Sequence, residues 1–99
     1  MKVIRFNTPT GQFHISLKLV AENRADYYIV KKQGYKKRSQ EYKDEVNWVM
    51  DDDFEAVDWL LNNSDWKDWK GSAIKLNDEV LVLSEGFWED SDNFEIIEI

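Results

Sequence analysis

The sequence contains no cysteine and only one histidine, His14. Without cysteine the chain forms no disulfide, zinc–thiolate site or thiol nucleophile, and one histidine leaves little room for metal binding or general-base catalysis. No apolar run approaches the ~18–20 residues that cross a membrane, and the basic start Met1–Arg5 lacks the apolar core of a signal peptide. We therefore expect a globular protein of the cytoplasm, bacterial or that of an infected host cell, with no membrane contact.

Motifs for cofactor or substrate chemistry are missing as well. There is no glycine-rich phosphate loop and no serine–histidine–aspartate grouping with supporting context. The residues around Asp90 and Asp92 resemble a calcium loop only weakly, because Phe94 stands at the fifth position, where an oxygen ligand belongs. We therefore predict a protein that is not an enzyme and holds no metal ion or cofactor.

The 99 residues are enough for one domain, and charge is divided unevenly along them. Residues 1–40 hold nine basic and two acidic side chains, whereas residues 41–99 hold four basic and eighteen acidic ones, which together give the net charge of −7. This division either steers a charged partner or is neutralised within the fold, where the basic half would face the acidic half. The sequence leaves both interpretations open.

Hydrophobic periodicity predicts an α+β domain. Residues 2–18 alternate around an Asn7–Gly11 turn, which predicts a β-hairpin with Phe13, Ile15 and Leu17 on one face. From Leu19 to about Lys32 the apolar residues recur every three or four positions, as in an amphipathic helix that stops before Gly34.

The central segment predicts more helix. Ser39 can cap a stretch over Tyr42–Leu61, which is either one helix or two that meet at Asp51–Asp52, with Asp52 and Glu55 as a capping box. Ser64 can cap a short helix through Trp66 and Trp69 to Gly71. The last part predicts extended segments and an acidic loop: Ile74–Leu76, Val80–Leu83, a loop over Glu85–Asn93, and a closing strand Phe94–Ile99. We expect a small antiparallel sheet from the N-terminal hairpin and the C-terminal strands, packed against two or three central helices.

Two tryptophans suggest a protein-binding surface. If Tyr42–Leu61 is one helix, Trp48 and Trp59 lie only about 20° apart around it, opposite its core face. Two exposed tryptophans among carboxylates are typical of an interface hot spot with an electrostatic rim. The alternative is that another element covers them as part of the core. The candidate residues are Trp48, Trp59, Asp44, Asp51, Asp52, Glu55 and Asp58.

A basic segment provides an alternative site. Five basic residues fall within eight positions beside one tyrosine, a composition that can hold phosphates and stack on a base. The acidic residues that follow can instead neutralise this segment as an ordinary surface loop. The residues concerned are Lys31, Lys32, Tyr35, Lys36, Lys37 and Arg38.

The chain also resembles small acidic proteins encoded in bacteriophage and prophage genomes. The resemblance rests on Leu19–Tyr28 and on Ala56–Asn63 with Trp66 and Trp69. It implies no catalytic residues, but it favours a host-interacting accessory protein. We therefore expect a protein-binding module, in its concrete form an inhibitor or modulator of a host nucleic-acid-handling protein. The alternatives are a nucleic-acid-binding accessory protein and a structural, self-associating phage component.

Overall fold

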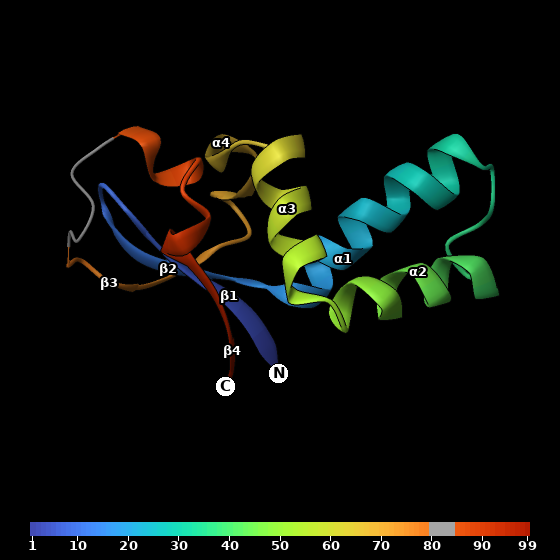
Figure 1. Cartoon of the computed structure of the whole chain (residues 1–99), viewed down its shortest axis with the longest axis horizontal. Coiled ribbons are helices and arrows are strands. Elements are labelled where there is room, and N and C mark those ends of the chain that lie inside the picture. The colour runs from blue at the N-terminus through green and yellow to red at the C-terminus, as the bar shows by residue number, and fades with distance from the viewer. Residues whose placement is uncertain (80–84) are drawn as a thin grey trace.

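The computed structural model describes residues 1–79 and 85–99, which form an α+β fold (Figure 1). Its antiparallel sheet has the strand order β3-β2-β1-β4. The strands are β1 (Lys2–Thr8), β2 (Gly11–Ser16), β3 (Ile74–Asn77) and β4 (Phe94–Glu98). The helices are α1 (Leu17–Ala25), η1 (Asp26–Lys32), α2 (Gln40–Met50), α3 (Asp53–Asn63), α4 (Trp66–Trp69), η2 (Glu85–Trp88) and η3 (Ser91–Asn93). The predicted fold class is therefore confirmed, while the predicted extended segment Val80–Leu83 lies outside the described residues.

The predicted β-hairpin is present, and the turn is tightly built. Phe6 lies opposite Phe13 and Ile4 opposite Ile15, so these four apolar residues share one face. The buried Thr8 hydroxyl donates a hydrogen bond to the Gly11 carbonyl at 2.9 Å, which closes the turn. Leu17 belongs to the following helix instead of the strand.

The first helix begins at Leu17, two residues earlier than predicted, because the Ser16 hydroxyl accepts a hydrogen bond from the backbone N–H of Leu19. The helix changes at Asp26 into the π-helix η1, which ends at Lys32 as expected. Gly34 then adopts a φ of 78°, the left-handed backbone that glycine allows at low cost.

The central segment is two helices, not one. The backbone of Asp52 is extended, and its carboxylate accepts a hydrogen bond from the backbone N–H of Glu55 at 3.2 Å. Asp52 therefore caps α3, and the helix over Tyr42–Leu61 is interrupted at the aspartate run. The interpretation with a continuous helix is wrong, and with it the expected angle of about 20° between Trp48 and Trp59.

The C-terminal aromatic residues complete the core over the sheet. Trp88 is buried in edge-to-face contact with Phe6 and Phe94, and its indole N–H donates to the Ser64 carbonyl at 2.9 Å. The predicted acidic loop over residues 85–93 therefore contains the short helices η2 and η3 and contributes a core tryptophan. Ser64 is not the cap of α4, because the neighbouring Asp65 forms the capping box.

Helices lie on one side of the sheet, and two of them project from it. In Figure 1, the hairpin of α1–η1 and α2 extends away from the strands, whereas α4 and η2 lie near them. Helix α3 packs against both α1 and α2 where these meet the rest of the fold. The loop between η1 and α2, which carries most of the basic segment, therefore lies at the far end of this projection.

Candidate functional site

Trp48 is exposed on α2 and stands among carboxylates. Its side chain is 48% exposed. With about 100° of rotation per residue, Glu41, Asp44, Glu45 and Asp51 all lie within about 60° of Trp48 around the helix axis. Trp48 is therefore the exposed, apolar centre of an acidic helix face, as expected for a residue of the candidate protein-binding surface.

Trp59 has a different environment. It is only 6% exposed, and its indole N–H donates a hydrogen bond to the Asn23 side-chain oxygen at 2.8 Å. Its ring also contacts those of Tyr27 and Tyr28, with centroids 5.7 and 5.5 Å away. Trp59 is therefore a packed residue between α1–η1 and α3, and the expectation that it is exposed beside Trp48 does not hold.

The two tryptophans are nevertheless joined through α1 and η1. The Arg24 guanidinium lies 4.7 Å from the Tyr28 ring centroid and 4.9 Å from that of Trp48, and it forms an ion pair with Glu45. Tyr28 in turn contacts Trp59. Arg24, Tyr27, Tyr28, Trp48 and Trp59 form one continuous group, which we call the aromatic cluster.

The aromatic cluster is closely packed yet partly exposed. Tyr27 and Tyr28 are each 38% exposed, like Trp48 only partly covered. The Arg24 side chain is 14% exposed, so its charge is largely removed from water and is compensated by the carboxylate and by two aromatic faces. Sequence reasoning missed Arg24 and both tyrosines. The spacing of Arg24 and Tyr28, four residues apart in a predicted helix, was the available signal.

The remaining carboxylates of the candidate surface have different positions. Asp44 is exposed and accepts a hydrogen bond from the Gln40 amide at 2.7 Å, and Asp51 ends α2. Asp52 is used as the cap of α3. Glu55 and Asp58 are partly buried on α3, and Asp58 accepts a hydrogen bond from the Asn62 amide at 2.7 Å. Asp44 and Asp51 therefore lie on the same face of α2 as Trp48, and Glu55 lies one turn before Trp59.

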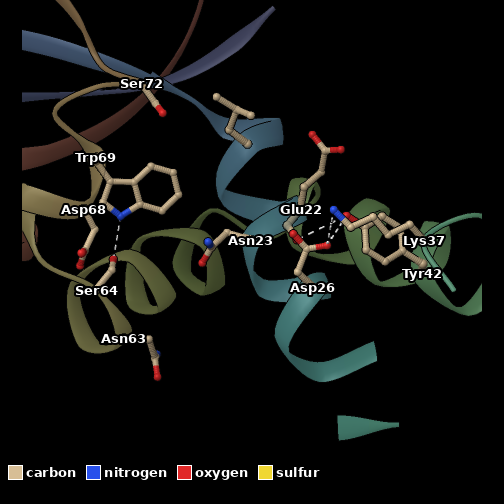
Figure 2. A pocket seen from close by; sticks show the side chains of 11 residues that line it. Glu22, Asn23, Asp26, Lys37, Tyr42, Asn63, Ser64, Asp68, Trp69 and Ser72 are labelled. Carbon is tan, nitrogen blue, oxygen red and sulfur yellow. Dashed lines mark hydrogen bonds and ion pairs between the residues drawn. The ribbon is translucent and has the colours of Figure 1, made fainter. Parts of the chain in front are cut away.

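A polar cleft lies beside the aromatic cluster, between α1–η1 and the end of α3 (Figure 2). Its volume is about 580 Å³, and carboxylates of Glu22, Asp26 and Asp68 line it. The Tyr42 hydroxyl donates to Asp26 Oδ1 at 3.1 Å, and Lys37 Nζ lies 3.4 Å from the same oxygen. Burial and the hydrogen bond to the Asp26 carboxylate raise the pKa of Tyr42 to about 12. The phenol therefore stays protonated near neutral pH and serves as a hydrogen-bond donor.

All six residues of the basic segment are exposed, and two of them have partners. Lys37 pairs with Asp26 in the cleft, and Lys32 Nζ lies 5.3 Å from the centroid of the Tyr27 ring. Tyr35 is exposed between Lys31 and Lys36 along the chain. Part of the positive charge is thus neutralised locally, and the rest faces solvent at the end of the helical projection.

Comparison with protein-family models, curated proteins and solved structures gives no match. In residues 1–79 and 85–99, acidic and histidine side chains do not gather into a group of three or more able to hold a metal ion. No helix in this part of the chain is long and apolar enough to span a membrane.

Proposed function

We propose that the protein is a non-catalytic module that binds another protein through the aromatic cluster and the acidic face of α2. In its concrete form, it inhibits or modulates a host enzyme that handles nucleic acid. The observation that carries this proposal is the half-exposed Trp48, fixed by Arg24 and bordered by carboxylates. Tryptophan and tyrosine dominate the binding energy of interfaces when they are held in place and desolvated by the partner.

The geometry favours tight binding because the aromatic side chains are ordered before a partner arrives. Arg24 lies against both Tyr28 and Trp48, so little rotamer freedom remains to be lost on association. Tyr27 and Tyr28 are partly exposed and add aromatic rings that carry a polar hydroxyl, which suits a contact that includes water. The partner is expected to contribute aliphatic or aromatic groups to this cluster.

The charge of α2 indicates what surrounds those groups on the partner. Glu41 to Asp51 spans about 15 Å of helix and carries four carboxylates near Trp48, on average about 5 Å apart along the axis, of which Glu45 is paired with Arg24. One DNA strand carries a phosphate about every 3.4 Å along the helix axis, so this helix face presents a sparser row of charge of the same sign. A basic groove that accepts nucleic acid would therefore also attract this helix face.

The test begins with affinity capture of proteins from nuclease-treated bacterial lysate and continues with the purified partner by calorimetry. We expect Trp48→Ala to weaken binding by about thirtyfold or more, which corresponds to the ~2 kcal/mol or more of a hot-spot residue. Asp44→Asn should chiefly slow association and reduce the salt dependence. The charge reversal Lys36→Glu with Lys37→Glu serves as the control and should leave partner binding intact. A partner whose affinity is unchanged by Trp48→Ala would contradict the proposed surface.

The alternative function, nucleic-acid binding, rests on the exposure of the basic segment at the end of the projection. Phosphates can reach Lys31, Lys36 and Arg38 there, with Tyr35 available for stacking. This function predicts that lysate capture recovers nucleic acid, which is lost after nuclease treatment. It also predicts that the reversal of Lys36 and Lys37 abolishes binding while Trp48→Ala has no effect.

A further inference from the structure

A second surface lies between α3 and the short helices η2 and η3. Phe54, Val57 and Leu61 form an apolar stripe on α3, and Glu89 and Ser91 stand across from it. Together with Asp58 and Asn62 these residues enclose a groove of about 340 Å³. Phe54 is 73% exposed at one end of the groove, although it is a large apolar side chain.

This groove is separate from the aromatic cluster. At about 100° per residue, Phe54, Val57 and Leu61 lie about 140–160° around α3 from Trp59. The core residues Ala56 and Leu60 lie between these two directions. The groove therefore occupies the side of α3 that faces away from Arg24 and Tyr28, and a change at Phe54 leaves the aromatic cluster intact.

The groove is lined by the apolar stripe of α3, which we call its floor, and by carboxylates, which we call its rim. Asp58 and Glu89 belong to its lining, and none of the described lining residues is basic. Further carboxylates stand next to it in the chain, at Asp53 before Phe54 and at Asp90 after Glu89. An occupant that fills the apolar floor must therefore carry positive charge along its flanks to match this rim.

We propose that the groove binds a basic amphipathic segment of a partner protein, with apolar side chains on the floor and lysine or arginine toward Asp58 and Glu89. From Phe54 to Leu61 the apolar stripe runs for about 10 Å, or two helical turns. A bound helix presents apolar anchors at three- and four-residue spacing over that length. This proposal does not depend on the function assigned to the aromatic cluster, because it uses different residues on the opposite side of α3.

The test uses a fluorescein-labelled peptide of about four helical turns, built from leucine and lysine with leucine at helical spacing on one face. One comparison peptide has glutamate in place of lysine, and another has the same composition in scrambled order. Binding is measured by fluorescence anisotropy, and the bound surface is mapped by amide chemical shifts of the isotope-labelled protein. The protein variants are Phe54→Ser, Glu89→Gln and, as matched control, Ile74→Ser, which removes an exposed apolar side chain from β3.

We expect the leucine–lysine peptide to bind and to shift the amides of α3 and η3. Phe54→Ser should weaken binding about tenfold, since it removes a large contact from the groove, and Glu89→Gln should weaken it less and reduce the salt dependence. Ile74→Ser and Trp48→Ala should leave the affinity unchanged. Because Phe54 is exposed, its replacement is not expected to unfold the protein, which circular dichroism verifies.

Any one of the following results would overturn the proposal. The first is equal binding of the scrambled peptide, which would indicate attraction by charge alone. The second is equal binding of the glutamate peptide, which would show that the carboxylates of the rim do not select a positively charged occupant. The third is an affinity unaffected by Phe54→Ser, or no binding at millimolar peptide. The fourth is a concentration-dependent dimer in sedimentation experiments that Phe54→Ser abolishes, which would make a second copy the occupant.

Discussion

The opposite environments of Trp48 and Trp59 predict opposite consequences when each is replaced by alanine. Trp59 is 6% exposed, contacts two tyrosine rings and donates a hydrogen bond from its indole N–H to the Asn23 side chain. Removing a buried tryptophan side chain costs about 3–5 kcal/mol, because the lost contacts add to the cost of the cavity. Domains of this size have a free energy of unfolding of about 5–15 kcal/mol, so Trp59→Ala should remove a large part of it.

Trp48→Ala is the matched control because it removes the same side chain from a half-exposed position. It loses the stacking of Arg24 on one ring, and we expect a cost of about 1 kcal/mol. The free energy of unfolding is measured by guanidinium denaturation followed by far-ultraviolet circular dichroism, with thermal unfolding as a second readout. A cost of 1 kcal/mol lowers Tm by about 4–8 °C in a domain of this length, so Trp59→Ala should lower it by about 12 °C or more.

The contribution of the indole hydrogen bond can be isolated in a double-mutant cycle. Asn23→Ala and Trp59→Phe each remove one partner, and we expect a coupling energy of about 1 kcal/mol between them. Equal losses of stability in Trp48→Ala and Trp59→Ala would refute the assignment of one tryptophan to the surface and the other to the core. A loss below about 1 kcal/mol for Trp59→Ala would refute the burial argument itself.

Three further predictions concern single contacts. Asp52→Ala should lower the free energy of unfolding by about 1 kcal/mol in urea denaturation, because it removes the cap of α3. The pKa of Tyr42 is raised from its ordinary value of 10.0 to about 12 in the folded state, so its contribution to the free energy of unfolding is fully present below about pH 10 and is lost as the pH rises through about 12. When the free energy of unfolding is measured at increasing alkaline pH, Tyr42→Phe should lack this loss. Gly11→Ala should cost about 1–3 kcal/mol and speed amide exchange in β3, since φ is 136° and an added Cβ would lie 2.3 Å from the Asn77 carbonyl oxygen.

The elements of the fold could be predicted from the sequence wherever one local rule applied. The alternation through Phe13 and Ile15 produced the correct hairpin, because a strand with one buried face shows period two. The aspartate run allowed two interpretations, and Asp52 decided between them only through its extended backbone and its bond to Glu55. Ser64 had the right chemistry for a cap but lay one residue too early, next to Asp65.

The candidate surface could be predicted only in part. The acidic face around Trp48 follows from helical spacing within α2, so the sequence was sufficient for it. The predicted position of Trp48 beside Trp59 depended on a continuous helix, and this prediction failed because the helix is interrupted at Asp52. Arg24 of α1 and Tyr28 of η1 enter the surface because α1 and η1 pack against α2, a contact between segments about twenty residues apart in the chain.

The sequence by itself determined the composition-level and short-range features: the separation of charge, the hairpin, the helical segments and the acidic stripe of α2. Only the tertiary structure decided which tryptophans are buried, since Trp88 in an acidic segment joins the core and Trp48 in a helix stays exposed. The physical reason is the range of the interactions. Periodicity and capping act over four or five residues, whereas burial depends on which distant element covers a side chain.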